Sequence, residues 1–88
     1  MSTATFTSIN AQVNEAAALG LDVENQAKHA ADWARAVSMH LAYAQGGKTD
    51  SYSLLQMSAA RDAAEHLRRY LQDALAALSD LDAVLAGR

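Results

Sequence analysis

Two pairs of residues have the types and spacing of metal ligands. His29 and Asp32 are three residues apart, and Asp62 and His66 are four residues apart. On a helix, these spacings bring the two side chains to one face, and imidazole nitrogens and carboxylate oxygens bind zinc and related metals. A metal site inside a helical bundle needs such pairs to project inward from facing helices. The heptad pattern described below places both pairs on the outer surface, so we expect no metal site.

Other chemical motifs are weak. The segment Gly46-Gly47-Lys48-Thr49 contains the end of a phosphate-binding loop, but it lacks the preceding strand and the first glycine of that motif. The chain has no cysteine, which removes thiol nucleophiles, disulfides and thiolate metal ligands. We therefore predict that the protein is not an enzyme and binds no cofactor.

Charge and hydropathy limit the possible partners. The net charge is -3, and residues 1–27 contain neither Lys nor Arg, whereas a general nucleic-acid binder needs a basic surface. Arg61, Arg68 and Arg69 form a local basic patch, which keeps an RNA-binding regulator as an alternative. No apolar run approaches the ~20 residues of a membrane span, and no basic segment followed by an apolar core marks a signal peptide. We expect a cytoplasmic protein, and export without a signal peptide remains open.

Apolar residues recur with heptad spacing in two long segments, the pattern of helices that pack along a seam. We label the alternating positions of this pattern a and d, and the position before each a is g. In the second segment these positions are Met57, Ala60, Ala64, Leu67, Leu71, Ala74, Leu78, Leu81 and Leu85. In the first segment they are Phe6, Ile9, Val13, Ala16, Gly20, Val23, Ala27, Ala30, Ala34, Val37, Leu41 and Ala44.

The residues between the two segments predict a short loop. Gly46 is expected to end the first helix in the left-handed conformation, Asp50 or Ser51 to cap the second, and Gly87 to stop it. The predicted fold class is all-α: one domain over residues 1–88, with a helix at about 6–45, a loop at 46–50 and a helix at about 51–86. A short loop makes the two helices antiparallel neighbours in a hairpin. The first helix is either continuous or broken or kinked near Gly20.

The g positions suggest both a register and a dimer. The g residues of the two segments form pairs that are equidistant in sequence from Lys48, as antiparallel pairing about the loop requires. The outermost pair is Gln12 with Val84, and the innermost pair is His40 with Gln56. A stripe of a, d and g positions is wider than a two-helix seam needs and fits a four-helix bundle. We predict a homodimer whose interface is the apolar g edge, formed by Leu19, Trp33, Tyr70, Ala77 and Val84.

A second apolar group lies outside that stripe, close to the loop. Exposed apolar clusters often mark binding sites, and Tyr and Met are common at interfaces. We therefore predict a non-enzymatic protein–protein interaction module: a small adaptor, a chaperone-like protein or an inhibitor. The predicted partner contacts are Met39, Tyr43, Tyr52 and Leu55.

The architecture resembles two families. A hairpin that dimerises into a four-helix bundle resembles the Rop-type RNA-binding regulators, which implies RNA binding. A small, Ala-rich, acidic hairpin without cysteine also resembles the WXG100-type secreted proteins, which implies export. The central turn of that family carries Trp-x-Gly, whereas here the turn is Gln45-Gly46-Gly47, and Trp33 lies within a helix. Its Tyr-x-x-x-Asp export signal is also absent after Tyr70, where Ala74 takes the acidic position.

Overall fold

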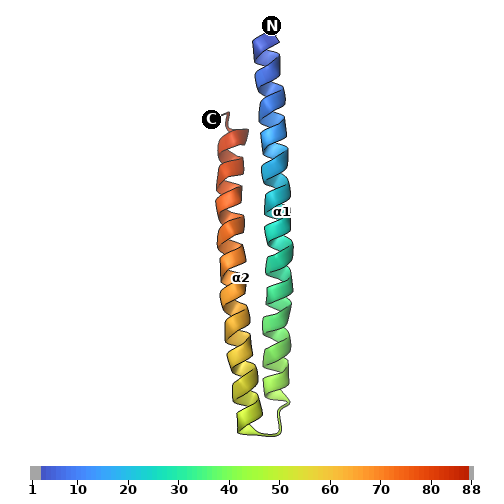
Figure 1. Cartoon of the computed structure of the whole chain (residues 1–88), viewed down its shortest axis with the longest axis vertical. Helices are drawn as coiled ribbons and strands as arrows, with labels where there is room; N and C mark the ends of the chain where they lie inside the picture. Colours follow the sequence, from blue (N-terminus) through green and yellow to red (C-terminus); the bar gives the residue numbers. More distant parts are fainter. Residues whose placement is uncertain (1–2, 88) are drawn as a thin grey trace.

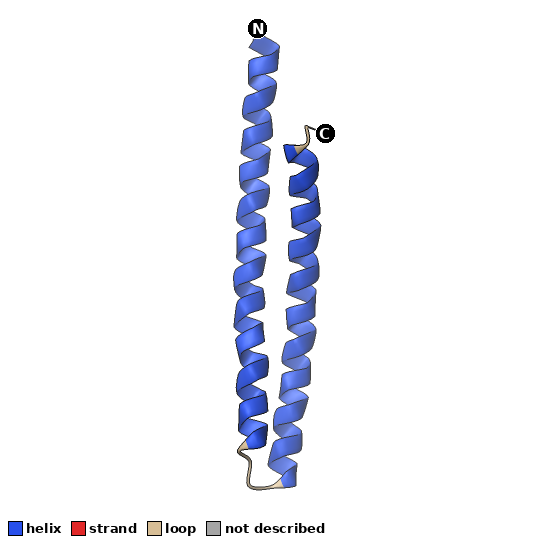
Figure 2. Ribbon diagram, turned by 180° about the vertical axis from the view of Figure 1, so that it is seen from behind, coloured by secondary structure: helices blue, strands red, loops and turns tan. Residues whose placement is uncertain are grey.

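A computed structural model describes the backbone of residues 3–87 and the side chains of residues 9–87. Within this part of the chain, two helices form an antiparallel hairpin: α1, Thr3–Gln45, and α2, Asp50–Leu85 (Figure 1). The hairpin is a rod of 72 × 14 × 11 Å. Both termini lie at one end and the loop lies at the other, as seen from both sides (Figures 1 and 2). The side chain of Phe6, the first expected a position, lies outside the described residues.

The helix α1 is continuous through Gly20. Its residues are mostly Ala, Leu, Gln and similar helix formers, and one glycine costs only about 1 kcal/mol in a helix interior. A Cβ atom at Gly20 would meet nothing within 4 Å, so the hairpin itself does not need a glycine there.

The loop differs in detail from the sequence prediction. Gly46 does not adopt the left-handed conformation, because its N–H continues the last turn by donating to the Ala42 carbonyl at 3.1 Å. The cap of α2 is Thr49 rather than Asp50 or Ser51: its backbone is extended and its Oγ1 accepts a hydrogen bond from the Tyr52 N–H at 3.1 Å. Gly87, with a φ of 84°, follows the end of α2 as expected.

Three hydrogen bonds between the helices confirm the predicted register. The Nδ1 of His40 lies 2.8 Å from the Oε1 of Gln56, near the loop. At the other end, the Nε2 of Gln12 donates to the Val84 carbonyl at 2.7 Å. Next to the loop, the Ser53 Oγ donates at 2.8 Å to the Ala44 carbonyl, which also accepts the Gly47 N–H at 3.3 Å.

The positions between the helices are d and g, whereas most described a positions are exposed. Two helices in contact cover only two positions of a three-position stripe. On α1, the g positions carry Leu19 and Trp33, while the neighbouring a positions carry Gly20, Ala27 and Ala34. On α1, turning g inward therefore buries larger apolar side chains than turning a inward, whereas on α2 it leaves Leu71, Leu78 and Leu85 of the a positions exposed.

Candidate protein-interaction surface

The a positions of both helices form an apolar surface along one side of the hairpin, which we call the open apolar face. In an antiparallel pair packed through d and g, the a positions of the two helices lie on the same side of the seam. Leu71, Leu78 and Leu85 of α2 are 48%, 41% and 62% exposed. Other exposed residues extend the face over the length of the hairpin: Val13, Ala27, Ala31, Ala34, Leu41, Leu54, Met57 and Leu75.

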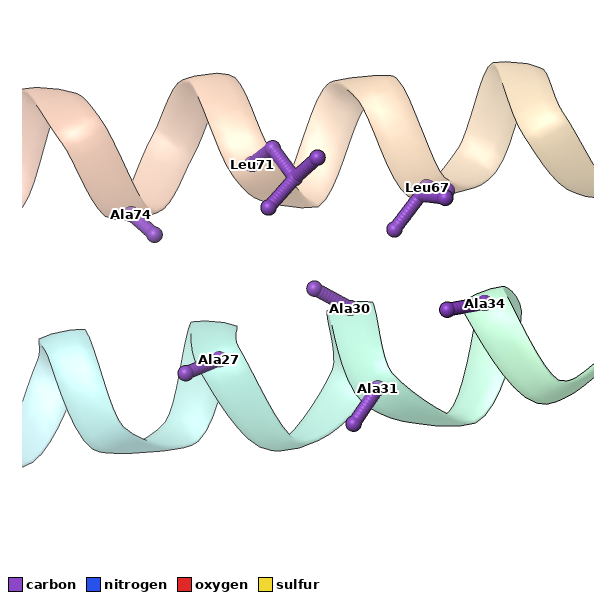
Figure 3. Close-up of a pocket in the computed structure, with 7 residues that line it drawn as sticks. All are labelled: Ala27, Ala30, Ala31, Ala34, Leu67, Leu71 and Ala74. Carbon is purple, nitrogen blue, oxygen red and sulfur yellow. The ribbon is translucent and has the colours of Figure 1, made fainter.

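A shallow groove of about 410 Å³ lies in the middle of the open apolar face. All the residues lining it are Ala or Leu: Ala27, Ala30, Ala31 and Ala34 of α1, and Leu67, Leu71 and Ala74 of α2 (Figure 3). The four alanines of α1 leave space that larger side chains would fill. The groove can make van der Waals contacts and exclude water, but it has no hydrogen-bonding side chain. It therefore suits an apolar side chain of a partner rather than a polar ligand.

The core of a single hairpin consists of small residues. Among the residues whose side chains are described, the buried ones are Ala30, Ala60, Ala63, Ala77 and Val84. Leucines at 54, 55, 71, 75 and 85 are about half exposed or more. Apolar area that could stabilise the fold is therefore still in contact with water at these leucines.

The opposite edge of the seam carries aromatic stacks. The rings of His29 and Tyr70 are stacked with centroids 5.0 Å apart, and those of Trp33 and His66 are stacked at 4.3 Å. Each stack joins α1 to α2. Within the described part of the chain, no three His, Asp or Glu side chains gather as a metal-binding group. His29 and His66, whose spacing to Asp32 and Asp62 matches metal ligands, thus pack against aromatic rings.

The residues predicted to form a dimer edge lie along the seam inside one hairpin. Ala77 and Val84 are buried there, while Leu19, Trp33 and Tyr70 are half-buried. Their role in contacting a second copy stays a prediction. The heptad pattern alone does not distinguish the open apolar face from the seam, although its signal is present in the leucines at a positions of α2.

The residues predicted as partner contacts are all exposed near the loop. Met39 and Tyr43 of α1 are 42% and 49% exposed, and Tyr52 and Leu55 of α2 are 42% and 66% exposed. The Tyr43 ring meets the His40 ring edge-on with centroids 6.5 Å apart. We call these four residues the loop-end cluster. It is separate from the open apolar face, because its residues lie on the outer sides of the helices.

The charged residues lie on the surface. Lys28 pairs with Glu24 at 3.7 Å and Arg35 pairs with Asp32 at 3.9 Å, in each case within α1 and largely exposed. Such exposed pairs contribute little to stability. Arg61, Arg68 and Arg69 are exposed on α2, and RNA binding through them stays a prediction.

Comparison with known proteins finds no matching family model, no significantly similar curated protein and no significantly similar solved structure. Neither helix, over the described residues, has a stretch long and apolar enough to cross a bilayer.

Proposed function

We propose that this protein is a non-enzymatic protein–protein interaction module that acts as a homodimeric four-helix bundle, in the role of a small adaptor, chaperone-like protein or inhibitor. The observation that carries the proposal is the open apolar face, which runs along both helices and includes half-exposed leucines. Continuous exposed apolar surfaces of this kind mark sites of association. A second hairpin that packed on this face would bury the exposed apolar side chains of both copies in one shared core.

The accessible area supports the same proposal. A compact folded chain of this mass exposes about 5,000 Å², whereas the hairpin exposes 6516 Å². The excess of roughly 1,500 Å² comes from the rod shape, which leaves one side of each helix uncovered. Stable dimers commonly bury about 800 Å² or more per partner. Pairing of two hairpins through their open apolar faces could supply that burial without any change in the fold.

The loop-end cluster is the proposed contact with a different protein. Because its residues lie on the outer sides of the helices, dimerisation through the open apolar face would leave it free. Tyr43 and Tyr52 each present an aromatic ring and a hydroxyl group near the loop, a combination that suits protein interfaces. The test is the double variant Tyr43→Ala and Leu55→Ala, which should lose a captured partner but keep the oligomeric state of the wild type.

Sedimentation equilibrium tests the proposed dimer, with the matched variants Leu71→Glu and Leu55→Glu. Wild type should be a dimer at tens of micromolar. Leu71→Glu places a carboxylate in the open apolar face and should dissociate the dimer, because burying an unpaired charge is costly. Leu55→Glu, in the loop-end cluster, should remain dimeric. A monomeric wild type at these concentrations, or equal effects of the two variants, would contradict the proposal.

A further inference from the structure

We propose that two copies pair through their open apolar faces about a two-fold axis parallel to the helices, so that both loops lie at the same end of the bundle. This inference rests on the proposed homodimer and specifies its arrangement. It is carried by an asymmetry between the two halves of the face, which differ in the size of their side chains.

The half of the face contributed by α1 is made of small residues over its middle section. It contains Gly20, Ala27, Ala31 and Ala34, and the groove lies over the three alanines. At the height of Gly20 and Ala27 the half contributed by α2 is large, whereas at the height of Ala31 and Ala34 its a position is Ala64. The large part presents Leu71, Leu75 and Leu78, which are 48%, 66% and 41% exposed. A strip of small side chains on α1, which we call the low strip, therefore runs beside a strip of large side chains on α2, which we call the high strip.

Face-to-face pairing of two identical hairpins allows two simple two-fold arrangements. An axis parallel to the helices places the α2 of one copy over the α1 of the other, at equal height. The high strip of each copy then fills the low strip of the other: Leu71 of one copy enters the groove near Ala27 of the second, and Leu75 packs near Gly20. The two-fold symmetry repeats this contact, so the low strips of both copies are filled at the same time.

An axis perpendicular to the helices, lying in the interface, gives the other arrangement. It places α1 over α1 and α2 over α2, with the loops at opposite ends. Alanine then faces alanine and leaves a void, while leucine faces leucine and is crowded. Interiors pack near crystal density, and both voids and crowding are destabilising. The side-chain sizes therefore favour the same-end arrangement.

The same-end arrangement has a functional consequence. It brings the loop-end clusters of the two copies together at one end of the bundle and all four termini to the other. The dimer would then present its two loop-end clusters at the same end, one on each outer side of the bundle. A partner with two equivalent binding segments would gain from both contacts at once.

Pulsed electron paramagnetic resonance on a spin-labelled Lys48→Cys variant tests the arrangement. The chain has no other cysteine, so the loop carries one label per copy. With loops at the same end, neighbouring helices are about 10 Å apart, and the label–label distance should be roughly 20–35 Å. With loops at opposite ends, the labels should be at least about 50 Å apart, the length of the 36-residue α2. A label at Ala11→Cys, near the other end, should repeat the short distance.

A second pair of variants tests the groove itself. Ala31→Leu fills the groove that would receive the second copy and should raise the dimer dissociation constant at least about tenfold through overpacking. Ala18→Leu makes the same change on an exposed position away from the face and should leave that constant unchanged. Circular dichroism checks that both variants remain helical.

The outcomes separate the two proposals. A dimer with short distances at both labelled positions supports the same-end arrangement. A dimer with long distances, or an Ala31→Leu variant that dimerises like wild type, overturns the arrangement but leaves the homodimer standing. A monomeric protein overturns the homodimer and this inference with it.

Discussion

The Nδ1 atom of His40 on α1 lies 2.8 Å from the Oε1 atom of Gln56 on α2. An amide oxygen only accepts hydrogen bonds, so the imidazole N–H is the donor. Both residues are half-buried at g positions eight residues from Lys48, one on each side of the loop. The bond therefore joins the helices at the height that the sequence register requires.

A double-mutant cycle should measure this bond. We expect His40→Ala and Gln56→Ala to show a coupling of about 1 kcal/mol in the free energy of unfolding, the usual net value of a partly buried hydrogen bond. Urea unfolding at fixed protein concentration provides the measurement. Because His40 also touches Tyr43, only the coupling term is informative. Strictly additive effects would show that the two side chains do not interact.

Gln26 and Gln12 should respond in opposite directions to the same substitution. The Oε1 of Gln26 is buried without a hydrogen-bond partner, while its Nε2 reaches Asp22 only at 3.4 Å. Gln26→Leu removes an unsatisfied acceptor from the seam and should raise the free energy of unfolding by about 1 kcal/mol. Gln12→Leu removes the donor to the Val84 carbonyl and should lower it by about the same amount. Thermal unfolding of both variants provides the measurement. A Gln26→Leu variant that is less stable than wild type would contradict the assignment of the Gln26 Oε1 as an unsatisfied acceptor.

The stack of Trp33 on His66 should depend on a flat ring rather than on the imidazole nitrogens. The rings are inclined by only 16°. His66→Phe keeps a ring and should retain most of the stability, whereas His66→Ala should cost about 0.5–1.5 kcal/mol. Trp33 is the only tryptophan, so its fluorescence reports the contact directly. Its emission should shift to longer wavelength in His66→Ala alone, and equal spectra for the two variants would contradict the stack.

The two loop glycines should differ in their tolerance of alanine. A Cβ at Gly47 would lie 2.6 Å from the Ser53 Oγ and 2.8 Å from the Tyr52 ring, whereas a Cβ at Gly46 would meet only the Ala42 carbonyl at 3.6 Å. Gly47→Ala would displace the Ser53 hydroxyl from the Ala44 carbonyl, so we expect a loss of about 1 kcal/mol. Gly46→Ala should be neutral or slightly stabilising. Unfolding curves for the two variants provide the comparison, and a neutral Gly47→Ala would show that the loop adjusts freely.

The helices, the loop and the register could be predicted from the sequence because each depends on local chemistry or simple periodicity. Gly46 and Gly47 are the only adjacent glycines, and the heptads keep one phase on each side of them. The caps were harder: Thr49, Asp50 and Ser51 all have suitable side chains, and only the backbone conformation selects Thr49.

The inward face could not be predicted, because the apolar stripe contains three positions and a two-helix contact uses two. Packing through a and d or through d and g differs by a modest rotation of each helix. The choice depends on the summed fit of side chains such as Trp33, Tyr70 and Leu71 across both helices. Periodicity alone does not contain that information, and so the open apolar face was found only in the structure.

The spacing of the three interhelical hydrogen bonds implies an order of folding. The residues they join are 9 apart in sequence at Ser53 and Ala44, 16 apart at His40 and Gln56, and 72 apart at Gln12 and Val84. The entropic cost of closing a chain segment rises with its length, so contacts beside the loop form most readily. Each contact that forms lowers the entropic cost of the next one along the helices. We expect the helices to zip together from Gly47 toward the termini. During synthesis, this pairing can begin while the C-terminal half of α2 is still being made.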